Sequence, residues 1–403
     1  MNHQKIERII KDFGHERLCG SKAEKEFAAY LKKECEELNI PAEIETFNIT
    51  DYEIGDEQLW IDGEKIFCKA YMGCGCADLT APLFYMPTVD EFSLAECKGK
   101  IVLLDNGVAE KKFRSLVESG ALGLIIRGGS IQHKDPFLRR RELRFASRLE
   151  ENIPCLLIGT EDYISILKNH KKQARIIVEQ KALTRRSYNV AAEIEGEIEE
   201  SIVLAAHIDS TEESLGVYDN LSGCMALMEM AEYFANHRPY RTIQFLWCGS
   251  EERGLLGSIA YCRRHKAELK KAVCNITLDM IGSMIGGFCM MACANRESLE
   301  VMEGFAKEKK FSATSKFILR STDVKPFVYA GVPAISFARY AGDEVAPIHT
   351  HYDTPEAVTP RSIIRDSRFI CDFTAFLVNA EEFPIPRIID EQMEREAKEY
   401  IEK

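Results

Sequence analysis

The sequence predicts an α/β fold in which helices cover both faces of a sheet, with a β-rich domain inserted into it. From residue 188 onward, short apolar runs typical of buried strands alternate with helical patterns. Such alternation builds a sheet between two helical layers. Between residues 47 and 180, short strands and turn residues predominate instead. The chain has 403 residues, enough for about two or three domains.

Composition is that of a globular protein and limits its partners. Apolar residues make up 46% and charged residues 29% of the chain, and 52 basic against 64 acidic residues give a formal net charge of −12. So acidic a chain lacks the basic footprint that nucleic acids and anionic membranes require, and we expect neither as a partner. The longest uncharged stretch, residues 280–294, is shorter than the roughly 20 residues of a membrane span, and we expect a pair of buried strands there.

The cysteines and the first residues predict a reducing environment. Fourteen cysteines are present, and the charged N-terminal segment lacks the apolar core of a secretion signal. These features are typical of free thiols in a cytoplasmic protein. The sequence carries no pattern that fixes the number of subunits, so an oligomer stays open.

The chain opens with two predicted helices. Apolar residues at helical spacing between positions 6 and 13 are followed by Gly14 as a stop signal. Ser21 and Glu24 form an S-x-x-E capping box, and the apolar stripe behind it predicts a helix that ends at Leu38. In the insert, strands are expected at residues 100–104, 122–126 and 154–158, and helices at 113–119 and 163–167.

The remaining chain supplies the elements of the main sheet. Strands are expected at residues 202–206, 242–248, 273–278 and 333–337. Helices are expected at residues 223–236, 255–269 and 298–309, with a final surface helix at 388–403. Because the strand runs are apolar throughout, we expect them to be buried on both faces.

Residues able to bind a metal follow the predicted strands. In open α/β sheets, ligands bind beyond the carboxyl ends of the strands. Two imidazoles and several carboxylates, without cysteine, suit Zn²⁺ or a similar ion, and an Asp at a helix start is well placed to bridge two ions. Each motif alone is also typical of surface or capping residues, so the prediction depends on the ordered set. Its members are His207, Asp209, Asp219, Glu251, Glu252, Asp279, His349, His351 and Asp353.

The segments around these residues resemble a known family. AAHIDS, VYDNLSG, SEERGLLGS, TLDMIGS and IHTHYDT are similar, in order and spacing, to the signatures of the aminopeptidase Y family of co-catalytic zinc exopeptidases. The resemblance covers about residues 185–380, and RLCGSKAEKEFAAYLKK resembles that family's N-terminal helix. The insert, with ADLTAPLFY, CKGKIVLLD and ESGALGLIIRGG, looks like a protease-associated domain.

The resemblance implies a fold and a set of roles. The fold is a three-layer, mixed-sheet zinc exopeptidase domain formed by residues 1–48 and 184–403, with the protease-associated-like domain at 49–183. Two Zn²⁺ ions per chain are implied, with cobalt or manganese as other possible metals. His207 and Asp279 would bind one ion, Glu252 and His349 the other, and Asp219 would bridge them. Glu251 would be the general base and Asp209 would orient the His207 ring. The family often has a cis peptide at the position of Asp219–Asn220.

The function implied is hydrolysis of N-terminal residues of peptides, as an aminopeptidase. A carboxypeptidase or dipeptidase on the same scaffold stays open, because Arg339 is a candidate to hold a substrate carboxylate. Two further functions are glutaminyl cyclisation, as in a one-metal relative, and non-catalytic binding. The complete set of five ligands and a base argues against both. His351 is expected to be exposed or to line the pocket, and not to bind metal.

Overall fold

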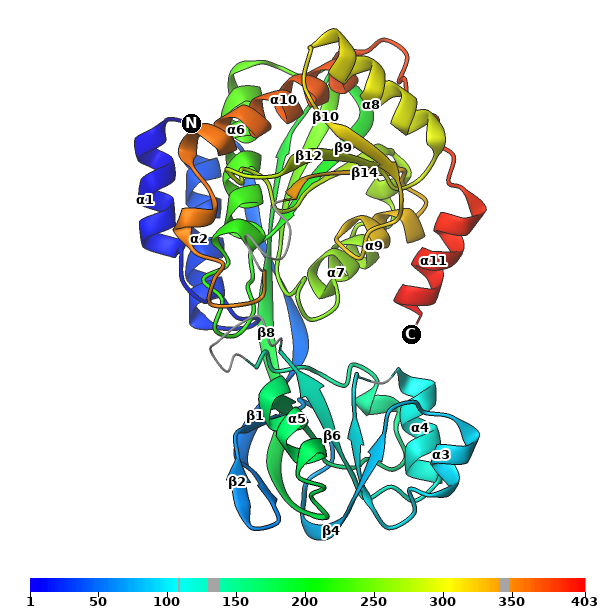
Figure 1. Cartoon of the computed structure of the whole chain (residues 1–403). Coiled ribbons are helices and arrows are strands. Elements are labelled where there is room, and N and C mark those ends of the chain that lie inside the picture. Colours follow the sequence, from blue (N-terminus) through cyan, green and yellow to red (C-terminus); the bar gives the residue numbers. More distant parts are fainter. Residues whose placement is uncertain (108, 130–137, 341–347, 403) are drawn as a thin grey trace. The chain divides into compact units, whose positions relative to one another are not determined.

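The computed structural model describes residues 1–107, 109–129, 138–340 and 348–402, and the chain divides into two compact units. Unit 1 consists of Met1–Ile49 and Arg186–Lys403, and unit 2 of Thr50–Arg185. Two long strands, β1 (Ala42–Ile61) and β8 (Gln173–Ile194), contain residues of both units (Figure 1). Unit 1 is therefore discontinuous in sequence.

The sheet of unit 1 is mixed. Its strand order is β13-β12-β14-β11-β9-β10-β8. The strands other than β8 are β9 (Ile198–His207), β10 (Arg241–Cys248), β11 (Ala272–Leu278), β12 (Gly287–Ala292), β13 (Thr314–Phe317) and β14 (Ala334–Tyr340). The four central strands β14, β11, β9 and β10 are parallel, whereas β8 and β12 run antiparallel to their neighbours β10 and β14. The carboxyl ends of the central strands therefore meet at one edge.

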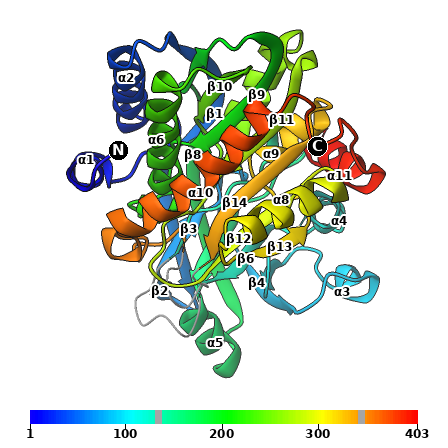
Figure 2. The ribbon, with the colours of Figure 1, turned by 90° about the horizontal axis from the view of Figure 1, so that it is seen from above.

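Helices cover both faces of this sheet (Figure 2). Side chains of β9 alternate between the faces: Ile202, Leu204 and Ala206 join one apolar core, and Val203 and Ala205 join another. The first core includes α1 (His3–Phe13), α2 (Lys22–Glu37), α6 (Ser222–Asn236), α8 (Arg296–Glu308) and α10 (Pro360–Asn379). The other face packs on α7 (Leu256–Arg264), α9 (Val324–Tyr329) and α11 (Glu391–Ile401). The predicted mixed sheet between helical layers is confirmed.

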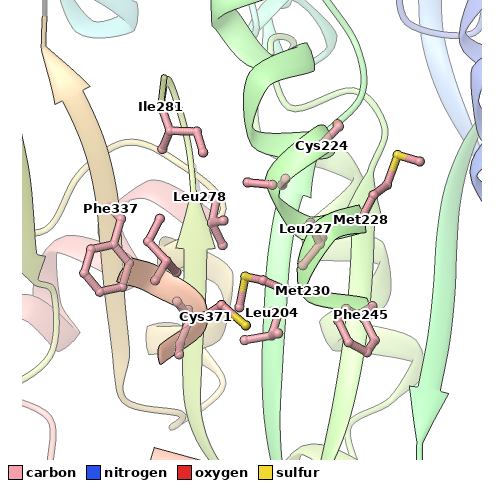
Figure 3. Close-up of a cluster of buried hydrophobic side chains, with 14 of the residues drawn as sticks. Leu204, Cys224, Leu227, Met228, Met230, Phe245, Leu278, Ile281, Phe337 and Cys371 are labelled. Carbon is pink, nitrogen blue, oxygen red and sulfur yellow. The ribbon is translucent and has the colours of Figure 1, made fainter. Parts of the chain in front are cut away.

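A dense apolar layer lies between the central strands and α6. Figure 3 shows Leu204, Leu278 and Phe337 from three strands facing Leu227 and Met230 from α6. All five side chains are fully buried, and burying a side chain of this size stabilises the fold by roughly 1.5–3 kcal/mol. Because such interiors are close-packed, this layer holds the strand ends above it in fixed positions.

Unit 2 has its own apolar core and its own strands. Its remaining strands are β2 (Glu64–Ile66), β3 (Cys68–Ala70), β4 (Ala77–Met86), β5 (Ile101–Leu104), β6 (Gly123–Gly128) and β7 (Cys155–Gly159). Its helices are α3 (Glu91–Ala95), α4 (Glu110–Glu118) and α5 (Thr160–Lys168). Strands β4, β5, β6 and β7 are neighbours in that order, and each pair is parallel. Leu103, Ile125 and Leu157 are buried at their centre. The three strands and two helices expected here are all present.

Two predictions about unit 1 are wrong in detail. Residues 280–294 form a loop and the single strand β12 instead of two strands, because Gly282 and Gly286 adopt positive φ angles of 73° and 98° that end any extended run. The helix expected to reach residue 269 ends at Arg264 and is followed only by the single turn Glu268–Lys270. None of the described helices is long and apolar enough to cross a membrane.

The thiols give a first test of this packing. All fourteen cysteines are unpaired, and only Cys76 is exposed. Burial raises the pKa of thiols such as Cys155 well above its usual value, which keeps them unreactive. We therefore expect a thiol reagent to modify one cysteine quickly in the native protein and fourteen after denaturation. A denatured count several thiols short of that number would reveal native disulfides.

Candidate metal centre

Three neighbouring parallel strands bring predicted site residues to one edge of the sheet. His207 is the last residue of β9 and is in register with Cys248, the last residue of β10. Glu251 and Glu252 follow β10 after a short turn, and Asp279 follows β11 directly. Because β10 and β11 flank β9, these side chains lie close together.

Asp219 lies between two histidines that are far apart in sequence. Its Oδ1 is 3.0 Å from His207 Nε2, and its Oδ2 is 2.9 Å from His349 Nε2. His207 Nε2 is also 3.6 Å from Asp279 Oδ1, and His349 Nε2 is 2.8 Å from Glu252 Oε1. The two oxygens of one carboxylate therefore face two separate groups of potential ligands.

The donor atoms fit divalent cations. Within the described residues, three sets have all their potential ligand atoms within 4.8 Å of one another. They are His207 with Asp219 and Asp279, Asp219 with Glu252 and His349, and His207 with Glu251 and Glu252. Asp279 Oδ1 is buried and accepts no hydrogen bond from the residues described, which is costly for a carboxylate unless a cation satisfies it. Imidazole nitrogens with carboxylate oxygens suit Zn²⁺.

The protein's own charges show how strongly this cluster attracts cations. Burial by itself lowers the pKa of His349, but Glu252 and Asp219 outweigh it and raise the pKa to about 9. Burial likewise opposes protonation of His207, yet Asp209, Asp219 and Asp279 raise its pKa well above the usual value. Without a metal, protons therefore occupy the cluster, so metal binding must release them and must weaken in acid.

Asp209 holds the turn that carries the two glutamates. Its Oδ1 accepts the backbone N–H of Glu251 at 2.9 Å, and its Oδ2 accepts that of Glu252 at 3.0 Å. His207 Nδ1 lies 3.1 Å from the Asp209 carbonyl oxygen and 3.6 Å from its carboxylate. Asp209 thus lies beside the imidazole, but its carboxylate is bonded mainly to the turn. Ser250 in this turn has φ of 55°, which needs such support.

The turn Val217–Leu221 positions Asp219 through its neighbours. The Asp219–Asn220 peptide is cis, as the family resemblance implies. The Asn220 side chain donates to Leu278 O at 2.9 Å and accepts from Gly223 N at 3.0 Å. A Cβ on Gly223 would lie 2.4 Å from Asn220 Oδ1, so only glycine fits. Asn220 therefore ties this turn to the end of β11.

The structure gives Asp353 a function that the sequence did not specify. Its carboxylate accepts three successive backbone N–H groups, from Val217 at 3.0 Å, Tyr218 at 2.7 Å and Asp219 at 3.0 Å. Burial and the Asp219 charge raise the pKa of Asp353 to about 6. The HxxxD spacing in IHTHYDT was the sequence signal that could have indicated this role, because it places Asp353 four residues after His349, and both residues contact Asp219. The role of Asp353 is to hold the backbone of that residue.

Two other residues that the sequence singled out lie outside the ligand groups. His351 is exposed, and its ring packs on Tyr352 with centroids 4.1 Å apart. Arg339 is buried and binds Asp366 in a bidentate pair, with both N···O distances 2.7 Å, and donates to Gly286 O at 3.0 Å. Its guanidinium is thus bonded to the protein itself.

Glu24 connects the second helix to the turn of the two glutamates. Its Oε2 accepts from Gly20 N at 2.7 Å, and its Oε1 accepts from Ser187 Oγ at 2.7 Å. Ser250 Oγ donates to the same Ser187 hydroxyl at 2.8 Å. The predicted capping box is half formed: Glu24 N donates to Ser21 Oγ, whereas the carboxylate bonds to Gly20 instead of Ser21. Burial, and then the Asp209 charge, raise the pKa of Glu24 to about 8.

This pKa predicts a pH-dependent term in stability. The folded carboxyl keeps its proton up to about pH 8, whereas the unfolded one loses it near 4.5. Its stabilising contribution is therefore complete below pH 4.5 and is lost as pH rises to 8, at about 1.4 kcal/mol per pH unit. From pH 5.5 to pH 7.5, this term should lower the free energy of unfolding of the wild type by about 2–3 kcal/mol, and Glu24→Gln should lack it. Measured by urea unfolding, the variant should therefore become more stable relative to the wild type by that amount over the interval. Glu26→Gln, on the exposed side of the same helix, should show no such gain; equal pH slopes for wild type and Glu24→Gln would contradict the burial argument.

Comparison with known proteins finds relatives of this chain. The sequence model of Peptidase family M28 matches residues 189–374, the segment that contains every ligand candidate. An aminopeptidase of Pseudomonas aeruginosa is 30% identical over 191 residues, which are 46% of this chain and 35% of that protein. The chain thus spans about a third of the length of that relative. Aminopeptidase YwaD of Bacillus subtilis is 26% identical over 355 residues, 84% of this chain and 75% of that protein.

Solved structures show the same relationship in the fold. A zinc aminopeptidase from Bacillus subtilis superimposes with a TM-score of 0.79 and 25% identity, over 97% of each chain. The match therefore extends over residues of both units. The mixed α/β sheet of unit 1 is the fold of M28 aminopeptidase structures.

Proposed function

We propose that this chain is a metal-dependent aminopeptidase of the M28 type that binds two zinc ions. The observation that carries the proposal is the position of Asp219, whose two oxygens face one ligand group with His207 and another with His349. A carboxylate in that position is what a bridged pair of ions requires. The names of the similar proteins from Pseudomonas and Bacillus support the activity.

The residues divide into ligands and a base. His207 and Asp279 would hold one ion, Glu252 and His349 would hold the other, and Asp219 would contribute to both sites. When bound, such ions lower the pKa of a bound water and polarise the scissile carbonyl. Glu251 takes the proton of the attacking water and passes it to the leaving amine. Without metal ions, burial raises the pKa of Glu251 well above its usual value; the His207 charge opposes this and the Glu252 charge adds to it.

The charges around the site favour the amino end of a peptide. Asp219, Glu251, Glu252 and Asp279 gather negative charge in one place, which attracts an N-terminal ammonium. Recognition of a carboxyl end would instead need a cation, and the candidate Arg339 is already bonded to Asp366 on both of its carboxylate oxygens. This contact weighs against a carboxypeptidase or a dipeptidase.

A glutaminyl cyclase or a non-catalytic binding module fits these residues less well. A one-metal cyclase would need only one of the two ligand groups that share Asp219, whereas this chain has both. A non-catalytic relative would have no need of Glu251 beside the ligands.

We further propose that unit 2 is a protease-associated-like domain, because ADLTAPLFY, CKGKIVLLD and ESGALGLIIRGG contribute to its parallel strands. A cytoplasmic location, with peptides as substrates, completes the proposal.

Substrates with free and blocked amino ends test the function. Zinc-loaded protein should hydrolyse an aminoacyl p-nitroanilide, because the ammonium meets the carboxylates of the site. The N-acetylated form of the same compound should be inert, and chelator treatment followed by added zinc should remove and restore turnover. Release of C-terminal residues from N-blocked peptides, with no action on the free aminoacyl compound, would establish a carboxypeptidase instead.

A further inference from the structure

The carboxylate of Asp209 has a third donor that comes from the beginning of the chain. The Cys19 thiol donates to Asp209 Oδ2, with a distance of 3.2 Å between sulfur and oxygen. The same oxygen accepts from Glu252 N, while Oδ1 accepts from Glu251 N. Asp209 is fully buried, so its carboxylate depends on donors from the protein instead of bulk water.

The segment that carries Cys19 is itself bonded to the residues that follow β9. Arg17 N donates to Ser210 Oγ at 3.0 Å, and the Arg17 guanidinium donates to Ile208 O at 2.9 Å. On the other side, Gly20 N donates to the buried carboxyl group of Glu24. The thiol therefore approaches Asp209 from a segment bonded on both sides. Burial, with the nearby Asp209 and Glu24, raises the pKa of the Cys19 thiol well above its usual value, so it keeps the proton it donates.

The turn that Asp209 holds is tightly constrained. Ser250 takes the left-handed conformation with φ of 55°, which few residues other than glycine adopt readily. Gly249 is packed so closely that a Cβ would lie 2.4 Å from Tyr188 O. The next two backbone N–H groups, those of Glu251 and Glu252, both donate to the Asp209 carboxylate. The orientation of that carboxylate therefore affects where the two glutamates point.

We propose that Cys19 is a positioning residue for the reaction, because its thiol fixes the Asp209 carboxylate that holds the turn of Glu251 and Glu252. The inference rests on the proposed function, since it acts through the base and one ligand. Loss of groups that orient metal ligands typically lowers metal affinity or activity by 10- to 100-fold. Cys19 acts on Glu251 and Glu252 only through Asp209. The expected effect is therefore near the lower limit of this range, about 10-fold.

Three cysteine variants of the full chain test the role. Cys19→Ala removes the donor, Cys19→Ser keeps a donor in the same place, and Cys35→Ala is the matched control. Cys35 is also buried, on α2, in the apolar core of unit 1. Each protein is measured for zinc affinity by competition with a chelating indicator, for kcat and KM, and for melting temperature. If Cys19→Ala fails to fold, Cys19→Val, which restores the volume without the donor, takes its place.

The inference predicts a pattern that packing alone would not produce. Cys19→Ala should bind zinc about 10-fold more weakly and lose about 10-fold in kcat with KM nearly unchanged. Cys19→Ser should restore both to within about threefold, because a hydroxyl also donates, and Cys35→Ala should match the wild type in both. Wild-type values for Cys19→Ala, or equal losses for the Ala and Ser variants, would overturn the role. If the wild type lacks aminopeptidase activity, the proposed function fails, but zinc affinity still decides the question for Cys19.

Discussion

Glu251→Gln should lower kcat by about 10²–10⁴-fold while both metal ions stay bound, because a positioned proton acceptor contributes on that order to turnover. Glutamine has the same shape and keeps the backbone N–H bond to Asp209, so the turn should be undisturbed. It cannot accept the proton of the attacking water. KM should change little, since the metal ligands remain and three of the four carboxylates that attract the substrate keep their charge.

The adjacent residue provides the contrast for this prediction. Glu252 Oε1 lies 2.8 Å from His349 Nε2 in one ligand group, so Glu252→Ala should weaken one metal site. Bound-metal counts and kinetics on both variants separate the roles. Metal loss in Glu251→Gln together with two retained ions in Glu252→Ala would mean that the roles are exchanged, and near-normal kcat in Glu251→Gln would identify another base.

Asp219→Asn should remove nearly all turnover and leave fewer than two metal ions per chain. Burial alone would raise the pKa of Asp219, but its hydrogen bonds to His207 and His349 outweigh this and lower it, so the residue is a carboxylate. Asparagine offers one acceptor oxygen and one NH₂ group, and therefore cannot present an anionic oxygen to each ligand group. Elemental analysis of metal-saturated wild type should find two zinc ions, the number that this bridging position implies.

An exposed aspartate serves as the control for that substitution. Asp78 pairs with Arg175 on the surface of unit 2, at 2.9 Å and with 57% of its side chain exposed. Asp78→Asn makes the same chemical change and should keep both ions and full activity. Two tightly bound ions in Asp219→Asn would show that the bridge is not Asp219.

Local patterns in the sequence predicted much of the fold because each strand of the main sheet is short and apolar. The runs before His207, Glu251 and Asp279 became β9, β10 and β11, and parallel strands that end in register bring the residues after them together. The loop after Asp279 was predicted wrongly because apolar residues there resemble a strand, while the positive φ of Gly282 and Gly286 depends on packing.

Contacts between distant segments could not be predicted in this way. The three bonds that Asp353 accepts and the bond from Cys19 to Asp209 join residues more than a hundred positions apart. No periodicity encodes such pairs, because each partner alone reads as a loop residue. The ion pair of Arg339 could not be predicted either, because it depends on Asp366 of α10 lying 2.7 Å away in the folded protein.

The division of unit 1 into Met1–Ile49 and Arg186–Lys403 has a consequence for synthesis on the ribosome. Helices α1 and α2 are translated before Thr50–Arg185, but α6 and the strands that share their apolar core are translated only after it. At about 5–20 residues per second, that delay is on the order of ten seconds. The intervening unit has a separate core and can fold meanwhile. During the wait, α2 relies on local support, including the pairs Lys22–Glu26, Lys32–Glu36 and Lys33–Glu37 one helical turn apart, each worth about 0.2–0.5 kcal/mol.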